Sequence, residues 1–457
     1  MSSGLTKELT QGDAFRLLLV FTVPILLGNV LQQFYLLTDS AIVSNFLGVE
    51  RLAAVGASTS ITFLILGFCN GCAGGMAIPV AQAFGARDYA ALRRFVFNAL
   101  RLAACLSVTL ALASSLLCRS IITWIHVPGD IFDDAYVYLL ILFIGIPCSF
   151  FYNLLASIIR ALGDSRTPFL FLLFSTSLNI ALDLLFMLGF KWGVAGAAVA
   201  TVVAHAISAA LCFRIMMLNY DVLRESREDR RFDRASALQL LGIGVPMGLQ
   251  FSITAIGSIM IQSSNNSLGT VFVAGFAAGV RIKMLFMVAL ESLGIAMTTF
   301  CGQNIGAGKP ERIIEGVKAC MVMTAVYSLL CLAVIWPLSV PLARIFVGAS
   351  DTEIIAAAVR YIRTTVAFFF LLGSLCVFRY SIQGLGFTNF AMWSGVMEMI
   401  ARVLVSVLLV APWGFSAVCL ADGIAWIAAN LFLIPAFVHV FRKVAGGTTF
   451  GVVRHSA

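Results

Sequence analysis

Twelve long apolar stretches, separated by polar residues or by proline and glycine, constrain this sequence more than any other feature. A helix that crosses a bilayer needs about 20 consecutive, mainly apolar residues. Of the 457 residues, 60% are hydrophobic and 11% are charged, which excludes a soluble globular protein, because soluble domains are about 45–50% apolar. The expected helices cover residues 14–44, 52–84, 94–119, 133–160, 168–190, 193–218, 237–265, 273–305, 313–343, 353–383, 390–411 and 415–442. We therefore expect an all-α integral membrane protein with twelve transmembrane helices.

The basic residues indicate membrane topology rather than nucleic-acid binding. The formal net charge is +8, but lysine and arginine are scattered between apolar stretches instead of forming one basic face, so we expect no nucleic-acid partner. They concentrate in alternate connections, which the positive-inside rule places in the cytoplasm together with both chain termini. The expected organisation is an N-terminal six-helix lobe (1–217), a highly charged cytoplasmic linker (218–236), a C-terminal six-helix lobe (237–445) and a cytoplasmic tail (446–457).

The two halves repeat one another. The run SNFLGVERLAAVGASTSI around Gly48 matches NNSLGTVFVAGFAAGVRI around Gly269, and AQAFGARDYAALRR matches GQNIGAGKPERII at the same offset of 221 residues. A third pair, RALGDSRTP and QGLGFTNFA, is offset by 223 residues. Two halves of six helices in the same order face the membrane in the same orientation, so we expect a pseudo-twofold axis along the membrane normal.

Few ionisable residues lie within the expected helices of the first half. They are Asp39, Asp183 and His205; Asn179 lies four residues before Asp183, and Thr201 lies four before His205, so each pair shares one helix face. A charge within the membrane is costly and is a functional candidate by default. Converging helices would let the carboxylate, amide and hydroxyl oxygens coordinate sodium or hold a shared proton. Alternatively, the aspartates only hydrogen-bond neighbouring helices, and His205 is either a proton relay or a packing residue.

The second half lacks the matching acids. The repeat offsets place Met260, Arg402 and Ser406 where the first half has Asp39, Asn179 and Asp183. Glu398 lies four residues before Arg402, a spacing at which the two charges can neutralise each other. The repeat has therefore become functionally asymmetric.

Two other carboxylates of the second half, Glu291 and Asp422, are candidates for a substrate cavity, as is His205 of the first half. Either carboxylate could instead pair structurally with Arg281 or Lys283 near the start of the eighth helix. The chain also contains 37 phenylalanines, and a large apolar cavity with a few carboxylates would suit hydrophobic organic cations. Pro24 in the first helix is a candidate hinge, with a static kink as the alternative.

These residues and motifs resemble the multidrug and toxic compound extrusion (MATE) transporters over essentially the whole chain. The resemblance rests on Pro24, Asp39 and the segments GGMAIPVAQAFGARD, RALGDSRTP, NIALD, GVAGAAVAT and GQNIGAGKPER. It implies two six-helix lobes around a cleft that opens alternately inward and outward, and antiport in which sodium or proton entry drives the efflux of cationic drugs. The bacterial character of the match implies a multi-pass protein of the plasma (inner) membrane.

The resemblance also implies where the coupling cation binds. One branch of the family holds it in the N-terminal lobe, and this pattern carries over onto Asp39, Asn179, Asp183 and Thr201. We expect no other metal site and no cofactor apart from the coupling ion, Na+ or H+. The expected partners are small organic substrates and membrane lipid, with no obligate partner protein.

The alternatives are a flippase for lipid-linked saccharides and an intramembrane enzyme. A flippase cavity should be strongly basic to hold pyrophosphate, whereas the charges recognised here at membrane depth are mostly acidic. An enzyme needs a nucleophile or metal constellation, and the four histidines are dispersed along the chain. The sequence also lacks the GxxxxGK[ST] motif of ATP-driven pumps.

Overall fold

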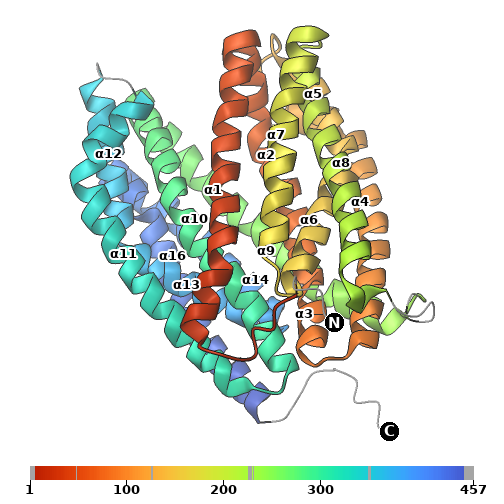
Figure 1. The fold of residues 1–457 in the computed structure, drawn as a ribbon. Helices are drawn as coiled ribbons and strands as arrows, with labels where there is room; N and C mark the ends of the chain where they lie inside the picture. The colour runs from red at the N-terminus through yellow and green to blue at the C-terminus, as the bar shows by residue number, and fades with distance from the viewer. Residues whose placement is uncertain are drawn as a thin grey trace. The chain divides into compact units, whose positions relative to one another are not determined.

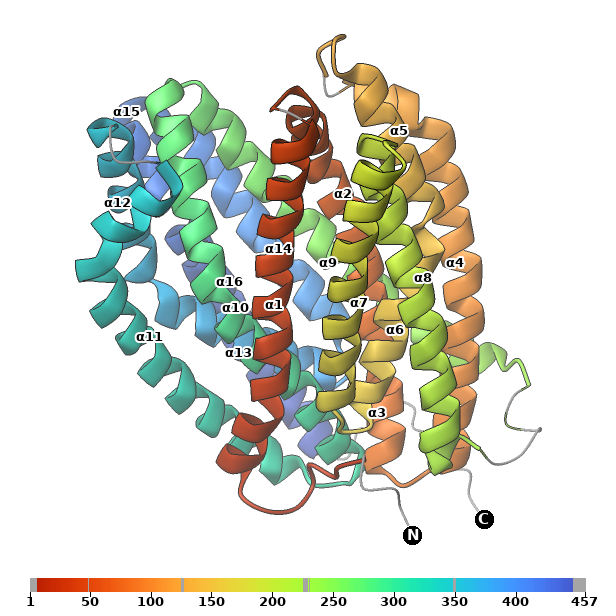
Figure 2. The same cartoon turned by 45° about the horizontal axis from the view of Figure 1, so that its top comes forward.

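The computed structural model describes residues 6–47, 49–124, 127–224, 229, 231–347 and 351–446, and every regular element within them is helical (Figures 1 and 2). Ten of the described helices are long and apolar enough to cross a membrane, and two bent helix pairs raise the number to as many as twelve. The prediction of an all-α membrane protein is confirmed. Gly48, part of the 218–236 linker and the tail from residue 447 lie outside the described residues.

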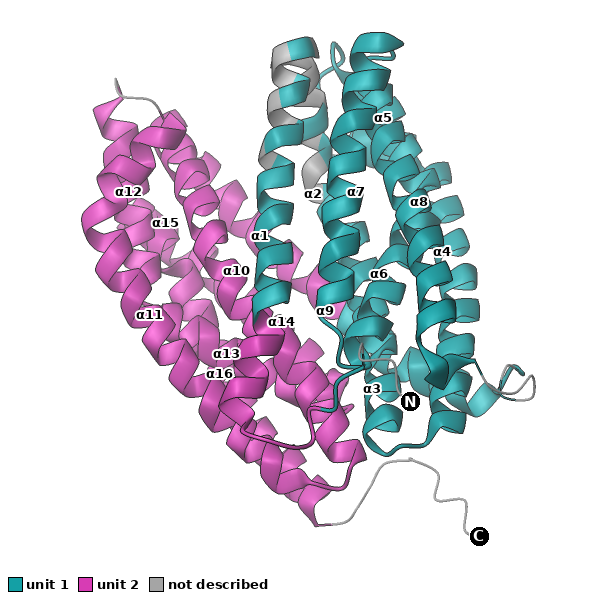
Figure 3. Cartoon of the chain, viewed as in Figure 1, with its two compact units in different colours: residues 1–8, 23–248 teal, residues 9–22, 249–457 magenta. Residues whose placement is uncertain are grey.

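The chain divides into two compact units, which Figure 3 colours separately. Unit 1 comprises residues 1–8 and 23–248, and unit 2 comprises residues 9–22 and 249–457. The division falls inside α1 (Ala14–Leu47) and α9 (Arg234–Asn266), so each of these helices contributes residues to both units. The units are therefore divided within helices, whereas the lobe boundaries expected from the sequence lie in the connection between the sixth and seventh helices.

The remaining elements fall wholly within one unit. Unit 1 contains α2 (Val49–Met76), α3 (Ile78–Gly85), α4 (Tyr89–Trp124), α5 (Phe132–Ile144), α6 (Ile146–Ala161), α7 (Arg166–Leu184), the π-helix η1 (Leu185–Gly189), α8 (Val194–Asn219) and the 3-10 turn η2 (Asp221–Leu223). Unit 2 contains α10 (Thr270–Gly306), α11 (Pro310–Val347), α12 (Thr352–Val366), α13 (Phe369–Gly384), α14 (Thr388–Leu404), the π-helix η4 (Val405–Leu409), α15 (Val410–Trp413) and α16 (Phe415–Ala445).

The backbone of the two units carries the repeat seen in the sequence. The pair α5 and α6 bends by 48°, and the pair α12 and α13 bends by 50°. A π-helix follows α7 in unit 1 and α14 in unit 2. Positive backbone φ angles recur in pairs, at Arg87 and Gly308, Gly163 and Gly386, and Gly193 and Gly414. Residues at equal distances from these markers therefore occupy equivalent places in the two units.

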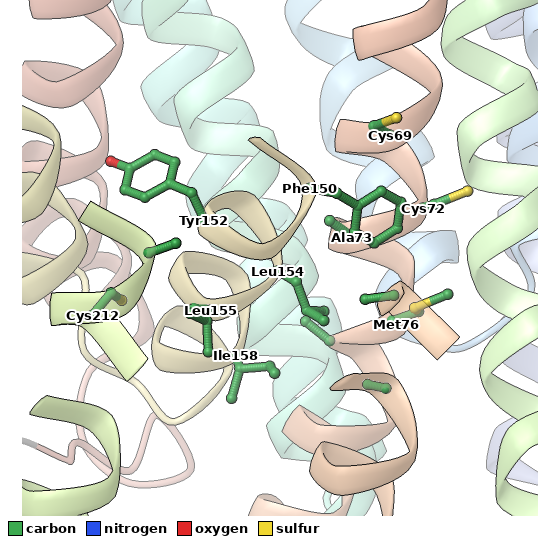
Figure 4. Packing of buried hydrophobic residues seen from close by; sticks show 14 of the residues in the cluster. Cys69, Cys72, Ala73, Met76, Phe150, Tyr152, Leu154, Leu155, Ile158 and Cys212 are labelled. Carbon is green, nitrogen blue, oxygen red and sulfur yellow. The ribbon is translucent and has the colours of Figure 1, made fainter. Parts of the chain in front are cut away.

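The core of unit 1 packs α6 against α2. Figure 4 shows Phe150 and Leu154 on α6 directed towards Ala73 and Met76 on α2, and all four side chains are buried in one cluster. Cys72, from the CxxC of the sequence, is fully buried in the same cluster. This cysteine is therefore part of the apolar packing, as free buried cysteines usually are.

Glycines let α2 and the first part of α9 approach closely within unit 1. A Cβ atom at Gly71 would lie 2.6 Å from the carbonyl oxygen of Met247, and one at Gly75 would lie 2.7 Å from the Cα of Gly244. Small residues at such spacing are the usual means by which membrane helices bring their backbones together. The N-terminal part of α9 is thereby held to unit 1.

The charged linker is anchored to α4. Arg93 forms an ion pair of 2.7 Å with Asp229, and the backbone N–H of Asp233 donates to Asn98 over 3.1 Å. Asp233 then caps α9 by accepting hydrogen bonds from the backbone and hydroxyl of Ser236. These bonds hold the pKa of Asp233 below its ordinary value. The described part of the linker is therefore ordered by contacts within unit 1.

Candidate cation-binding site

Three of the four predicted cation ligands are joined by hydrogen bonds in unit 1. Asn179 and Asp183 lie one turn apart on α7, and Thr201 lies on α8. In one of its two amide orientations, Asn179 forms hydrogen bonds with both its nitrogen and its oxygen. The nitrogen donates to Asp183 Oδ2 over 2.8 Å, and the oxygen accepts from the Thr201 backbone N–H over 3.0 Å. The asparagine thus holds the aspartate of α7 and the threonine of α8 in one arrangement.

Asp39 on α1 interacts electrostatically with residues of the same group. Its carboxylate acts electrostatically on Asp183 and on the phenols of Tyr35 and Tyr138. In the same orientation the Asn179 nitrogen also lies 3.2 Å from the Tyr35 hydroxyl, which is 3.4 Å from Thr201 Oγ1. We refer to Tyr35, Asp39, Tyr138, Asn179, Asp183 and Thr201 as the unit 1 cluster.

Each carboxylate of this cluster has one buried oxygen atom without a hydrogen-bond partner. Asp183 is 0% exposed, and the Oδ1 atoms of Asp39 and Asp183 are both buried and accept no hydrogen bond. Among the described residues, the partners that the structure gives these two carboxylates include no lysine or arginine. Unpaired carboxylate oxygens are costly in an apolar surrounding, so this arrangement is suited to receiving a hard cation or a proton.

The side chains of the unit 1 cluster offer oxygen atoms to a cation. The described residues contain no group of three or more His, Cys, Asp or Glu side chains that could hold a metal ion. Its donors are two carboxylates, an amide and hydroxyls, all of which bind through oxygen. The α-helix gives way to the π-helix η1 two residues after Asp183, and such local widening of a helix is frequent at functional sites.

Sequence reasoning did not identify the two tyrosines. Tyr35 precedes Asp39 by four residues, so the helical spacing that linked Asn179 to Asp183 could also have indicated Tyr35. Tyr138 lies on a different helix, α5, and has no such spacing to either aspartate. Only the fold brings Tyr138 to the cluster.

His205 contacts two residues of α6. Its Nδ1 lies 2.9 Å from Ser149 Oγ, and its ring stacks on Tyr152 at a centroid distance of 5.5 Å. Both partners belong to α6, and neither belongs to the unit 1 cluster. The histidine therefore has the satisfied surroundings that the packing alternative requires.

Asp422 is at the centre of a second polar group, in unit 2. Its Oδ2 accepts from Lys283 Nζ over 2.6 Å and from the Tyr361 hydroxyl over 2.8 Å. Its Oδ1 accepts from Arg402 Nη2 over 3.2 Å. This candidate for a substrate cavity is thus paired with Lys283, one of the two cations that the sequence offered as structural partners.

The ion pairs continue to Glu398 and Glu291. Glu398 accepts from Arg379 and lies 3.4 Å from Arg402, which confirms the predicted pairing at a spacing of four residues. The charges of Arg379 and Lys283 also act on Glu291. The unit 2 network therefore pairs three cations, Lys283, Arg379 and Arg402, with Glu398 and Asp422, and Glu291 lies within the electrostatic reach of Arg379 and Lys283.

Arg379 is a cation at membrane depth that the sequence analysis did not name. It lies within α13, between apolar residues, and is 7% exposed. Inspection of the FRYSIQ segment alone would have identified it as an intramembrane cation. Pro24 lies inside α1, which continues as a helix on both sides of it, so its role as a hinge stays a prediction.

Comparison with known proteins gives consistent matches along the chain. The sequence model of the MatE family matches residues 24–185 and 246–408, once in each half. The chain is 31% identical over 363 residues to the "Probable multidrug resistance protein YpnP" of Bacillus subtilis (strain 168), covering 79% of this chain and 80% of the relative. It is 28% identical over 413 residues to the "Probable multidrug resistance protein YoeA" of the same organism, covering 87% of this chain and 89% of the relative.

A solved structure has the same fold. It shows the outward-facing conformation of a multidrug resistance MATE family transporter of the MOP superfamily, with a TM-score of 0.88 and 22% sequence identity. The alignment covers 98% of this chain and 100% of the other.

Proposed function

Because this chain belongs to the MatE family of membrane transporters, we propose that it is an antiporter that exports organic, often cationic, compounds in exchange for Na+ or H+. Family membership confirms the resemblance predicted from the sequence and makes the chain a transporter of small molecules rather than an enzyme. Relatives with names that refer to multidrug resistance support a broad range of organic substrates.

One observation carries the proposal that a cation drives transport. The unit 1 cluster contains two carboxylates whose buried Oδ1 atoms have no donor, whereas Glu398 and Asp422 of unit 2 form ion pairs. Two such charges within a membrane, with no counter-ion shown among the described residues, need one from solution. Na+ or H+ from the outside, bound between Asp39 and Asp183, supplies that charge.

Coupling follows if the cation binds the two transport conformations with different affinity. Asp39 lies on α1 and Asp183 on α7, so a cation held by both carboxylates fixes α1 against α7 within unit 1. A bend at Pro24, as in our hinge prediction, would then distinguish the cation-loaded from the empty state. The same conformational equilibrium would then control both drug release and cation entry.

The direct test is drug movement in proteoliposomes. Purified protein is reconstituted with a fluorescent organic cation, and sodium and pH gradients are imposed separately. We expect one of the gradients to drive movement against the drug gradient, which would also identify the coupling ion. If neither gradient drives movement of any cation tested, the antiporter is rejected and a flippase for lipid-linked saccharides is favoured. Transfer of a lipid-linked oligosaccharide across the membrane of the same vesicles would demonstrate that flippase activity.

The chain is a membrane protein, and we place it in the plasma membrane with both termini in the cytoplasm. The support is the basic character of alternate connections, such as the described turn at Arg87 and the segment beginning at Lys309. A green fluorescent protein fused after residue 457 should therefore fluoresce in bacterial cells, and a dark but full-length fusion at the membrane would contradict this orientation.

A further inference from the structure

The two units place different chemistry at equivalent positions. The buried positions of α7, residues 168, 171, 175, 179 and 183, correspond at one constant offset to the buried positions 391, 394, 398, 402 and 406 of α14 and η4. Arg402 therefore stands where unit 1 has Asn179, and Ser406 stands where it has Asp183. The ligand-bearing face of α7 thus has a counterpart in unit 2 that carries the paired charges of Glu398 and Arg402 and has no aspartate at the position of Asp183.

Two further members of the unit 1 cluster also have counterparts. Thr201 lies eight residues after Gly193, and Asp422 lies eight residues after Gly414; both glycines have positive φ and begin equivalent helices. Tyr138 and Tyr361 each lie 25 residues before the paired turn glycines, Gly163 and Gly386. Unit 2 therefore keeps a carboxylate and a phenol at positions of the cation cluster.

The ammonium group of a lysine contacts both this carboxylate and this phenol. Lys283 Nζ is 2.6 Å from Asp422 Oδ2 and 2.9 Å from the Tyr361 hydroxyl. Gly279 allows α10 and α12 to approach closely enough for these contacts. A Cβ atom at this position would overlap the ring of Tyr361 and separate the two helices. The lysine side chain is 12% exposed, so its charge is largely removed from solvent.

We propose that the ammonium of Lys283 occupies in unit 2 the place that the coupling cation takes in unit 1, and that its removal uncovers a second site for a monovalent cation at Asp422 and Tyr361. This inference rests on the proposed coupling site in unit 1. It makes Lys283 the residue that limits the transporter to one cation site.

The contacts of Asp422 support this assignment. Lys283 is the cation that lies at its Oδ2 atom, at 2.6 Å, whereas Arg402 lies 3.2 Å from Oδ1 and is shared with Glu398. Without Lys283, the partner that the structure gives to Oδ2 is the Tyr361 hydroxyl alone. A soluble monovalent cation can take the place of the ammonium there. The ammonium itself is covalently tied to α10, so it cannot be released to either side of the membrane and cannot couple to a gradient.

The test measures thermal unfolding of the detergent-purified protein against rising concentrations of NaCl or n-propylammonium chloride, with choline chloride holding ionic strength constant. In the double variant Lys283→Ala/Asp183→Asn, we expect a saturable rise of several degrees in the melting temperature with at least one of the two cations. Adding Asp422→Asn should abolish this rise. Arg281→Ala/Asp183→Asn is the matched control, because Arg281 is an exposed cation on the same helix, and it should show no saturable rise.

The outcomes separate this inference from the proposed function. A double variant that folds and shows no saturable response to either cation would overturn the inference, even if the unaltered protein responds through Asp183. A response of the unaltered protein that survives Asp183→Asn would instead reject the unit 1 site. If Lys283→Ala does not fold, Lys283→Gln keeps a hydrogen-bond donor towards Asp422 without its charge, and the same criteria apply.

Discussion

Replacing Asp183 by asparagine is expected to reduce gradient-driven drug efflux in proteoliposomes by about 5- to 150-fold, the range that coupling free energies of about 1–3 kcal/mol span. Asparagine has nearly the shape of aspartate but lacks the negative charge. The Oδ1 atom of Asp183 is buried and has no donor in the protein, so the variant loses its attraction for a cation without losing a protein ion pair. The measurement is the initial rate of efflux with and without the driving gradient.

The controls separate lost coupling from lost folding. Drug exchange at equal concentrations, without an ion gradient, should persist in Asp183→Asn because it needs only the substrate pathway. Asp133→Asn removes the same charge from the exposed first turn of α5 and should leave gradient-driven efflux unchanged. Asp39→Asn should resemble Asp183→Asn, and the double variant should be hardly worse than either, because two ligands of one ion are not additive. Normal gradient dependence in Asp183→Asn would reject this site.

The sequence predicted those parts of the site that lie on one helix. Asn179 and Asp183 share the face of α7 through their spacing of four residues, and the structure joins them by a hydrogen bond. Thr201 and Asp39 lie on other helices, and the sequence associated them with this pair only on the condition that the helices converge, and through the family resemblance. Tyr138 could not be found in this way, since neither local spacing nor a motif connects α5 to the aspartates.

The fold was also predicted only in part from the sequence. Apolar length indicated the spans, because a run of about 20 consecutive, mainly apolar residues is enough to cross a bilayer. It did not indicate the breaks inside the spans, at Ala77, Gly145 and Phe368. A break of this kind depends on packing against neighbouring helices, which hydropathy does not report. The division of α1 and α9 between two compact units is likewise a property of tertiary contacts.

Replacing Glu398 by glutamine is expected to destabilise the protein by about 3–5 kcal/mol, the usual cost of breaking a buried ion pair from one side. The Glu398 side chain is 3% exposed and faces Arg379 and Arg402, whose side chains are 8% and 6% exposed. The change removes the carboxylate that pairs with both arginines, so positive charge inside the membrane loses its partner. The measurement is the free energy of unfolding in detergent, from denaturant titration.

A double-variant cycle tests whether charge balance is the cause. Arg379→Met alone should also destabilise, but Glu398→Gln/Arg379→Met should be more stable than the sum of the single effects predicts, because it restores neutrality. Glu315→Gln is the control, since Glu315 is 56% exposed and lies 3.6 Å from Arg312, and such exposed pairs contribute at most about 1 kcal/mol. Strictly additive effects of Glu398→Gln and Arg379→Met would show that packing around these side chains, rather than their paired charge, stabilises unit 2.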